Sequence, residues 1–474
     1  MLDVRVGRSA PNTAGTAVPV VLGAVLPEAL RAAAAADGFT GAADTQCKVL
    51  TGQGRVLLVG LGSPAALDEE VMRRAGARAA AALMGVAHVA LDAHGLAPRA
   101  AAGFAAGACL RAWRFDRYHS RVAEGAARLV SIDLLTDTPD SVEAAWRSVS
   151  AGVRGALFAR DLVGEPGNVL TPQEFALRLQ GLARHGIAVG VLARAALARQ
   201  GLGALLAVGQ GSVHPPVMAV LRWKGRLKAA PVAFVGKGIT FDTGGICIKP
   251  AEGMELMRGD MAGAAAAAGA ILALALRNSP TPAIAVLPIA ENATGAASYR
   301  PGDVLRSFSG KTIEVVDTDA EGRLVLADAL AWTARQHRPR AMIDLATLTG
   351  SIVTALGHHM AGMFDSDEAL AAKVAAAGRE VGEPVWRMPI GEGHRRDLDS
   401  AIADIRHCLS ERMQPDACHG AAFLREFVGD VPWVHLDIAG VANRAAADPM
   451  HAVGPSGFGV RLLDRLVASC FESG

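Results

Sequence analysis

The stretch Asp317-Thr318-Asp319-Ala320-Glu321-Gly322-Arg323-Leu324 brings three carboxylates and one guanidinium together within eight residues. It follows the strand-like run 312–316 and precedes a helical run over residues 324–336. In an α/β fold, polar residues at the carboxyl end of a strand lie in the crevice where ligands bind. The placement therefore predicts an α/β arrangement with a ligand site at this turn.

Two carboxylates of this stretch are spaced to act together. Only the small residue Ala320 separates Asp319 from Glu321, so both side chains can point the same way in an extended or turning backbone. Apolar segments on both sides would hold the pair in a partly dry setting, where carboxylates repel and one pKa rises unless a cation intervenes. A solvated turn is the alternative interpretation. A bound metal is one cation that would stabilise the pair.

The composition indicates a well-packed protein of two domains. The chain has 474 residues, of which 51% are hydrophobic, 20% charged and only 4% aromatic. We therefore expect cores of close-packed helices and sheets built from small residues. The 47 Lys and Arg nearly cancel the 46 Asp and Glu. This balance does not favour nucleic acid or an anionic membrane as the principal partner.

The cysteines and the apolar runs favour a cytoplasmic location. Six cysteines occur without a CxxC motif, which is typical of reduced thiols in a cytosolic protein. The pairs His407-Cys408 and Cys418-His419 could in principle hold zinc, but their spacing does not match the usual fingers, so we expect ordinary loop and core residues. The first residues lack the pattern of a signal peptide. The longest apolar run, 261–276, is shorter than the ~20 residues that span a bilayer and predicts a buried core helix.

The first third of the chain alternates strand-like and helix-like segments. The expected strands are residues 20–25, 55–59, 88–91 and 129–134, and the expected helices are 27–36, 64–84 and 98–113. Such alternation favours a mostly parallel sheet flanked by helices. Residues 140–162 read as one long connecting helix, and we place the domain boundary near residue 155.

The α/β alternation resumes at Thr171, which reads as a helix N-cap followed by Pro172 at the first helical position. Several of the expected strands are near-continuous apolar runs, typical of strands buried on both faces. These strands are residues 187–192, 217–223, 232–235, 283–288, 312–316, 341–345 and 434–438. They predict a large open sheet sandwiched by helices.

Two further segments carry charged residues at expected strand or helix ends. Lys237, Asp242 and Lys249 emerge from the glycine-rich segment 234–250, in which glycines allow close approach of the backbone to a ligand. The spacing is not that of a phosphate-binding loop, and an ordinary glycine-rich loop with exposed lysines is the alternative. Asp260 precedes the apolar run and could be a simple N-cap carboxylate.

Taken together, these segments closely resemble the leucyl (cytosol) aminopeptidases, a family of two-metal peptidases. The resemblance rests on residues 235–249, 260–265, 318–324, 344–350, 386–389, 435–440 and 457–461. It covers essentially all of the chain after residue 160. It implies a smaller, macro-like N-terminal α/β domain over residues 1–155 and a larger catalytic domain over 156–474 with a central mixed sheet flanked by helices.

The resemblance also implies a role for each motif residue. One metal would be held by Asp242, Asp319 and Glu321, with the Asp319 carbonyl as an extra ligand, and the other by Lys237, Asp242, Asp260 and Glu321. The catalytic pair would be Lys249, stabilising an oxyanion, and Arg323, binding a bicarbonate that carries the proton. The pocket for the N-terminal side chain would contain Met257, Thr347, Gly350 and Ala439, which suits an apolar residue such as Leu or Met.

The chemistry of these residues agrees with that assignment. Four carboxylates balance the charge of two divalent cations, which would make a bridging water acidic enough to attack a peptide bond. Carboxylates with one amine and no Cys or His favour Mn²⁺ or Mg²⁺ and permit Zn²⁺, and the resemblance implies Zn²⁺ or Mn²⁺. Lys237 must be neutral to bind a metal, which requires a strongly lowered pKa. His358, His359 and His394 are expected to be structural.

The chain departs from the family pattern at two positions. Asp317 and Gly164 stand where the family usually has Asn. The Asp317 carboxylate would disturb the charge balance if it pointed towards the metals, although we expect activity to survive. For Gly164 we expect only a local effect.

The resulting hypothesis is a cytoplasmic, metal-dependent aminopeptidase that releases N-terminal residues from peptides. The resemblance implies a homohexamer whose active sites open to an internal cavity. A DNA-binding or regulatory protein, or a non-catalytic member of the family, is the alternative. The chain has no basic stripe that would favour nucleic acid as the main partner.

Overall fold

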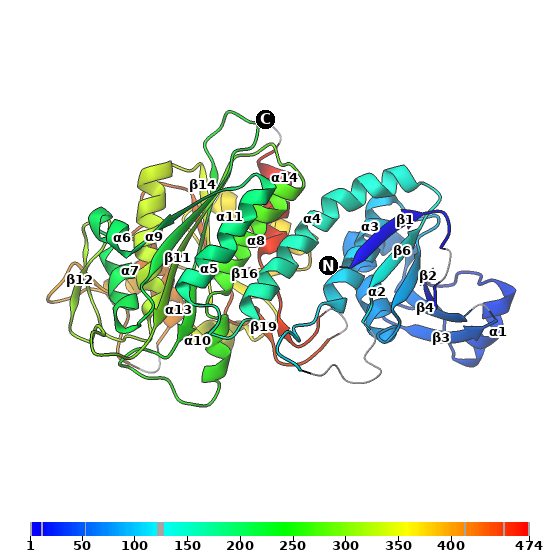
Figure 1. The fold of residues 1–474 in the computed structure, drawn as a ribbon, viewed down its shortest axis with the longest axis horizontal. Helices are drawn as coiled ribbons and strands as arrows, with labels where there is room; N and C mark the ends of the chain where they lie inside the picture. The colour runs from blue at the N-terminus through cyan, green and yellow to red at the C-terminus, as the bar shows by residue number, and fades with distance from the viewer. Residues whose placement is uncertain are drawn as a thin grey trace. The chain divides into compact units, whose positions relative to one another are not determined.

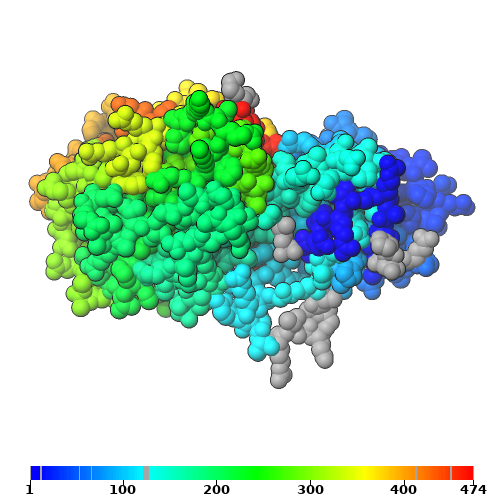
Figure 2. Space-filling view, turned by 45° about the horizontal axis from the view of Figure 1, so that its top comes forward, coloured from blue at the N-terminus to red at the C-terminus, as the bar shows by residue number. Residues whose placement is uncertain are grey.

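The computed structural model describes residues 2–10, 13–52, 54–120, 128–411, 414–448 and 451–472 (Figure 1). The chain forms two compact units. Unit 1 comprises Met1–Arg154 with Arg444–Gly454, and unit 2 comprises Gly155–Asn443 with Pro455–Gly474. Helix α4 (Pro139–Val163) runs through the boundary between them, as the long periodic segment predicted. Figure 2 shows the surface of both units, with most of unit 1 in blue to cyan and most of unit 2 in green to red.

Unit 1 contains a six-stranded sheet in the order β1-β6-β5-β2-β4-β3. Its strands are β1 (Asp3–Gly7), β2 (Gly15–Val21), β3 (Gln46–Thr51), β4 (Gly54–Gly62), β5 (His88–Asp92) and β6 (Ser131–Leu135). Every neighbouring pair is parallel except β3 with β4, which confirms the expected mostly parallel sheet. The sequence did not predict β1 or β3, because neither has an apolar run. The residues of β1 are partly or fully exposed, and those of β3 mostly alternate between exposed and buried.

The helices of unit 1 are α1 (Glu28–Ala36), α2 (Glu69–Ala82) and α3 (Pro98–Ala112). The prediction of a single helix over residues 64–84 is wrong for its first turn. Residues Pro64–Ala66 form the short 3-10 helix η1, and Leu67 is extended. Asp68 then caps α2 by accepting a 2.8 Å hydrogen bond from the amide of Val71, so the α-helix begins only after this carboxylate.

Unit 2 contains a nine-stranded mixed sheet in the order β16-β15-β18-β14-β9-β11-β8-β7, with β10 paired to β11. Its strands are β7 (Ala188–Leu192), β8 (Val217–Trp223), β9 (Val232–Gly236), β10 (Gly238–Asp242), β11 (Ala283–Asn292), β14 (Ala341–Ala346), β15 (Ala361–Asp365), β16 (Val385–Arg387) and β18 (Trp433–Asp437). The central strands β9 and β14 are buried along their whole length, as continuous apolar runs predict.

The helices of unit 2 surround this sheet (Figure 1). They are α5 (Pro172–Gln180), α6 (Arg194–Gln200), α7 (Gly203–Val208), α8 (Ala262–Leu276), α9 (Glu321–His337), α10 (Gly350–Leu356), α11 (Glu368–Glu380), α12 (Glu392–Arg396), α13 (Asp416–Arg425) and α14 (Val460–Cys470). Short 3-10 helices are η2 (Gly181–His185), η3 (Gly209–Gly211) and η4 (Met254–Gly259). Thr171 caps α5 through its hydroxyl, as expected.

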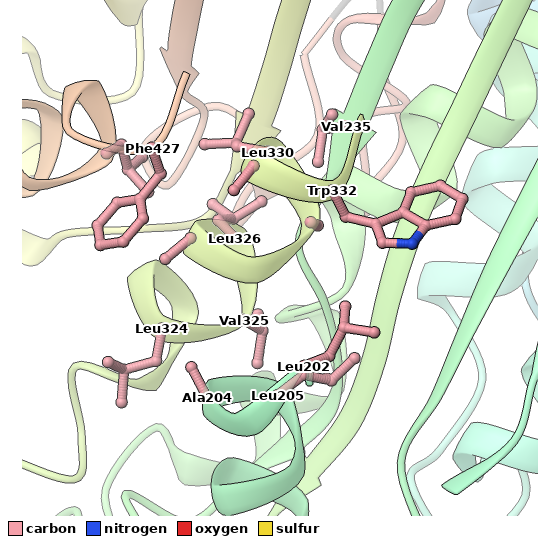
Figure 3. Packing of buried hydrophobic residues seen from close by; sticks show 14 of the residues in the cluster. Leu202, Ala204, Leu205, Val235, Leu324, Val325, Leu326, Leu330, Trp332 and Phe427 are labelled. Carbon is pink, nitrogen blue, oxygen red and sulfur yellow. The ribbon is translucent and has the colours of Figure 1, made fainter. Parts of the chain in front are cut away.

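Two of these helices form the core against the sheet. Leu324, Leu326 and Leu330 of α9 belong to one buried cluster with residues of the α7 region and with Val235 of β9 (Figure 3). Helix α8 is buried on nearly all sides, which confirms the core helix expected from its apolar sequence. The segment Met254–Leu276 is long and apolar enough to cross a membrane, but 89% of its most apolar window is buried within the protein.

The strand expected at residues 312–316 differs from the prediction. It is the three-residue strand β13 (Thr312–Glu314), which belongs to a separate small sheet with β12 (Val304–Arg306) and β17 (Ile405–Arg406). A further two-stranded sheet joins β19 (Asn443–Arg444) and β20 (Gly454–Pro455). The turn with Asp317, Asp319 and Glu321, which follows β13, is therefore not connected to a strand of the large sheet. It enters the buried helix α9, which packs on that sheet.

Candidate active site

The site begins at the carboxyl ends of two central strands. Lys237 follows β9 directly, and Asp242 is the last residue of β10, which runs parallel to β11. The amide of Lys237 donates to the carbonyl of Leu345 in β14, which fixes the backbone where the lysine leaves the sheet. Asp242 Oδ1 accepts a 2.8 Å hydrogen bond from the amide of Gly244. Both side chains are almost completely buried.

Two other segments bring carboxylates to the same place. Asp260 lies between η4 and α8, and Asp319 and Glu321 lie where the chain enters α9. The turn before α9 is tied to the glycine-rich loop by Thr318, whose hydroxyl donates to the carbonyl of Gly244 at 2.6 Å and accepts from the amide of Cys247. This side chain holds the two motif loops together although they are more than 70 residues apart.

Lys237 lies between two of the carboxylates. Its Nζ is 2.8 Å from Oδ1 of Asp260 and 2.8 Å from Oε1 of Glu321, and it donates a 2.8 Å hydrogen bond to the carbonyl of Thr347. A Cβ atom at Gly322 would lie 2.7 Å from Cε and 2.8 Å from Nζ of Lys237. Glycine at this position therefore leaves room for the lysine amine beside the first turn of α9.

Lys249 occupies the corresponding position between the other two carboxylates. Its Nζ is 2.9 Å from Oδ2 of Asp242 and 2.5 Å from Oδ1 of Asp319. The Lys249 side chain is 20% exposed, whereas that of Lys237 is 4% exposed. Lys249 thus lies on the solvent side of the cluster, where a substrate could reach its ammonium group.

The crowding of charges perturbs the acids of the site. Burial, reinforced by the neighbouring Asp242 carboxylate, raises the pKa of Asp319 to about 7. Burial also raises the pKa of Asp242 and, well above its ordinary value, that of Asp260; the nearby Glu321 carboxylate adds to both shifts. Without a further cation, this many carboxylates do not all ionise readily.

The two lysines respond in the opposite sense. Burial lowers the pKa of Lys237, but the carboxylates of Asp260 and Glu321 outweigh it, and the pKa is raised. The same competition raises the pKa of Lys249, chiefly through Asp242. Burial lowers the pKa as expected but does not by itself make Lys237 neutral. The charge of a bound metal would add to the effect of burial and favour the neutral form of the amine.

The cluster has the donor chemistry of a divalent metal site. One carboxylate oxygen from each of Asp242, Asp319 and Glu321 lies within 4.8 Å of the other two. Glu321 Oε2 and Asp260 Oδ2 are buried and accept no hydrogen bond. Buried carboxylate oxygens without donors are costly unless a cation is present. These residues therefore fit metal ions, and oxygen donors with one amine suit Mn²⁺.

Arg323 is brought to the site by the first turn of α9, but its guanidinium is already engaged. Nη1 donates a 2.9 Å hydrogen bond to the carbonyl of His407, and Nη2 donates a 2.8 Å hydrogen bond to Oδ1 of Asp416 on α13. The residue is only 1% exposed. Burial lowers its pKa, but the Asp416 carboxylate outweighs this effect and the pKa is raised.

The four expected pocket residues come from three loops around the cluster. Thr347 Oγ1 donates to Oδ1 of Asp260 at 2.7 Å, so this residue touches the site directly. Met257 lies in η4, and its carbonyl accepts from the amide of Asp260. Gly350 begins α10. Ala439 follows β18, and its amide donates to Oδ1 of Asp437.

Two residues that the sequence did not predict support the site. Asn292, at the end of β11, donates from Nδ2 to Oδ1 of Asp242 at 2.7 Å and to the carbonyl of Thr318 at 3.0 Å. Asp437 is buried and accepts from the amide of Leu348, the hydroxyl of Thr349 and the amide of Ala439. Each is a polar residue ending a buried apolar strand, which is the signal that could have identified them.

The structure also settles the direction of Asp317. Its Oδ1 accepts a 2.9 Å hydrogen bond from the amide of Asp319, so the carboxylate stabilises the turn locally. Asn could make the same contact through its side-chain oxygen. Gly164 ends α4 with its amide bonded to the carbonyl of Arg160, a local structural role.

Four of the histidines expected to be structural make contacts with the backbone or with a carboxylate. Both ring nitrogens of His407 contact backbone carbonyls, and Nε2 of His419 contacts Oδ2 of Asp397. His358 Nδ1 contacts the carbonyl of Gly440, and His394 Nδ1 accepts from the amide of Gly391. Within the described ranges, no cluster of His and Cys has the geometry of a metal site.

Comparison with known proteins agrees with this geometry. Residues 157–464 match the model of the cytosol aminopeptidase family, catalytic domain, and residues 9–121 match the model of the N-terminal domain of the same family. A probable cytosol aminopeptidase of Sinorhizobium fredii is 43% identical over 476 residues, covering 98% of this chain and 95% of the relative. One of Rhizobium meliloti is 44% identical over 478 residues, with the same coverage.

Solved structures of similar proteins share the whole fold. The bottromycin maturation enzyme BotP in complex with Mn superposes with a TM-score of 0.87 at 35% identity, covering 96% of this chain and 99% of that one. A mutant of tomato leucine aminopeptidase superposes with a TM-score of 0.85 at 31% identity, covering 98% and 96%. Both units of this chain are therefore represented in proteins of known structure.

Proposed function

This chain belongs to the cytosol aminopeptidase family and is a metal-dependent aminopeptidase, and on that premise we propose how its residues divide the work. Lys237, Asp242, Asp260, Asp319 and Glu321 hold two divalent cations. Lys249 and Arg323 carry out the catalytic roles. The single observation that best supports this division is the convergence of buried carboxylate oxygens without hydrogen-bond donors on one small volume.

Two cations bound there would supply the positive charge that makes a water molecule acidic and anchors the free α-amine of a peptide. The chain contributes the remaining steps. Glu321 contacts Lys237 and Asp242 contacts Lys249, and both carboxylates would help to hold the two cations. The ammonium group of Lys249, partly exposed, stabilises the oxyanion that forms at the scissile carbonyl. Recognition of the amine restricts cleavage to the N-terminal residue.

For the identity of the metals, we propose Mn²⁺ or Zn²⁺, with Mg²⁺ also compatible with the donors. The oxygen-rich donor set favours Mn²⁺. A structure of a relative 35% identical to this chain contains Mn.

For the anion at Arg323, the family resemblance points to bicarbonate, whose planar oxygens match the guanidinium fork. In this chain the carboxylate of Asp416 already contacts the same guanidinium.

For the substrate, we propose a peptide with an apolar N-terminal residue such as Leu or Met. Met257 offers an apolar contact, and Thr347 is held beside the metal cluster through Asp260. Gly350 and Ala439 have little side-chain bulk, which would leave room beside Met257 for a branched side chain.

Hydrolysis of leucine p-nitroanilide tests the assignment. The enzyme should be active with Mn²⁺, inactive after chelation and active again when Mn²⁺ is restored. Glu321→Gln keeps the shape of the side chain but removes a charge, and it should lower activity by roughly 1,000-fold and reduce the metal content. The exposed Glu392→Gln is the matched control. Unchanged activity in Glu321→Gln would refute the ligand assignment.

The assembly and location are also part of this proposal. We expect a homohexamer in the cytoplasm, as the resemblance implies, and relatives of this chain carry the name cytosol aminopeptidase. Light scattering coupled to size-exclusion chromatography of the full chain gives the mass directly. A monomeric mass at micromolar concentration would contradict the hexamer.

A further inference from the structure

The guanidinium of Arg323 has one acidic partner. Nη2 donates to Oδ1 of Asp416 at 2.8 Å, and this is the only ion pair that Arg323 makes within the residues described. Its other contact, the carbonyl of His407, is neutral. Arg323 is 1% exposed, so its positive charge depends on Asp416 for compensation.

The space around this pair is restricted. A Cβ atom at Gly420 would lie 3.6 Å from Cζ and from Nη2 of Arg323, and 3.1 Å from the side chain of Leu348. Helix α13 therefore passes close to the guanidinium and carries Asp416 one turn away from Gly420. Nε of Arg323 is buried and has no hydrogen-bond partner. The guanidinium of Arg323 therefore has hydrogen-bond partners on only some of its nitrogens, and its one charged partner among the described residues is Asp416.

We propose that Asp416 is a positioning residue whose carboxylate takes the place of an external anion on Arg323, so that bicarbonate binds this guanidinium well only when Asp416 is removed. The inference rests on the proposed function, because it concerns the arginine assigned a catalytic role there. Two anions on one guanidinium repel each other in a buried setting. The carboxylate supplied by the chain is always present, whereas bicarbonate must be drawn from solution.

This arrangement predicts a specific difference in anion dependence. The wild-type enzyme keeps Arg323 paired and oriented in buffer without carbon dioxide, so its activity needs no added bicarbonate. Asp416→Ala leaves the charge of Arg323 unpaired and opens space beside Nη2. Bicarbonate then occupies the vacated position, because its oxygens match the guanidinium fork.

The experiment compares wild type, Asp416→Ala and Asp416→Asn, each loaded with Mn²⁺, in carbon dioxide-free buffer with rising bicarbonate and with chloride keeping the ionic strength constant. Wild-type hydrolysis of leucine p-nitroanilide should change by less than about twofold. Asp416→Ala should lose roughly tenfold or more in kcat without bicarbonate and regain it with saturation. A variant that loses activity but shows no response to bicarbonate, or a wild type that needs bicarbonate equally, would overturn the proposal.

Thermal unfolding gives a second readout that does not depend on turnover. Bicarbonate should raise the melting temperature of Asp416→Ala more than chloride does at equal ionic strength, because a ligand that binds the folded state stabilises it. Wild type should show no such difference. Asp416→Asn removes the competing charge but leaves the space filled, so it should respond to bicarbonate more than wild type and less than Asp416→Ala. It carries the test if Asp416→Ala does not fold. An equal response in all three proteins contradicts the proposal.

A matched control separates this effect from the loss of any carboxylate paired with an arginine. Asp399 pairs with Arg395 at 2.8 Å on the surface, and its side chain is 70% exposed. Asp399→Ala should behave as wild type in both assays. If no protein hydrolyses the substrate with any metal, the proposed function fails, whereas the melting experiment still decides the role of Asp416.

Discussion

The side-chain amide of Asn292 donates a 2.7 Å hydrogen bond from Nδ2 to Oδ1 of Asp242, joining two buried residues that are 50 positions apart. The same amide reaches the carbonyl of Thr318 at 3.0 Å, next to Asp319. Asn292 therefore orients one proposed metal ligand relative to the loop that carries two others. Such supporting hydrogen bonds fix the direction in which a ligand presents its free oxygen.

Asn292→Ala should weaken metal binding by roughly 10- to 100-fold, because Asp242 loses the donor that orients it. The metal concentration giving half-maximal activity after chelation measures this directly. Asn168→Ala, at an exposed asparagine of the same unit, is the control. Equal metal dependence in both variants would show that Asp242 is oriented by other contacts.

Gly322→Ala should reduce activity while leaving the fold nearly intact. The new methyl group would lie within 2.8 Å of the Lys237 side-chain end, which can move away at little cost to packing but then leaves the cluster. We expect a loss of roughly tenfold or more in kcat/KM, with a small change in melting temperature. Gly393→Ala, where the added atom meets nothing within 4 Å, is the control. Full activity in Gly322→Ala would mean that Lys237 need not stay where it lies.

Asp317→Asn should leave the kinetics unchanged within about twofold, because Asn can accept the same hydrogen bond from the amide of Asp319. Asp317→Ala removes that contact and should impair activity by loosening the turn. The comparison of kcat/KM for the two variants separates the charge of the residue from its hydrogen bond. A large effect of Asp317→Asn would indicate that the negative charge acts on the metals.

Asp328 makes stability depend on pH. It is fully buried on α9, and its carboxylate accepts from the amides of Leu205 at 2.9 Å and Phe308 at 2.7 Å. Burial raises its pKa to about 7, partly opposed by these hydrogen bonds. In the unfolded chain the pKa is about 4. Between these values the folded protein binds more protons, so the contribution of Asp328 to stability falls as pH rises through that window.

Asp328→Asn should remove this pH dependence. We expect the unfolding free energy of wild type, relative to the variant, to fall by about 3 kcal/mol between about pH 5 and about pH 8. Urea unfolding at both pH values, at one fixed metal concentration, gives the difference. The side-chain amide of Asn also changes the contacts with the backbone N–H groups by an amount that does not depend on pH, so only the slope is informative. Parallel pH curves would contradict the assignment.

Much of the fold and site could be predicted because the signals are local. The apolar run of α8 and the continuous strands β9 and β14 are buried as their sequences indicate. The close spacing of Asp319 and Glu321 anticipated a carboxylate cluster, and the residues expected to hold metals do converge. Local spacing also misplaced one element, because the strand before this turn pairs in a small separate sheet rather than in the large one.

What could not be predicted depends on contacts between distant segments. Asn292 reaches Asp242 only because β10 and β11 run side by side. The pairing of Arg323 with Asp416 spans 93 positions and requires α13 to pass beside the start of α9. No local pattern encodes either contact, because a side chain's partner is set by which elements pack together.

The sequence by itself therefore determined the chemistry of this protein: which side chains could carry charge, bind metal and stabilise an oxyanion, and on which loops they stand. Only the tertiary structure decided how those charges are paired. It directs the Asp317 carboxylate into a local turn, leaves oxygens of Glu321 and Asp260 without donors, and supplies Arg323 with an anion of its own. The physical reason is that burial removes water, so each charge must find its partner in whatever segment the fold brings beside it.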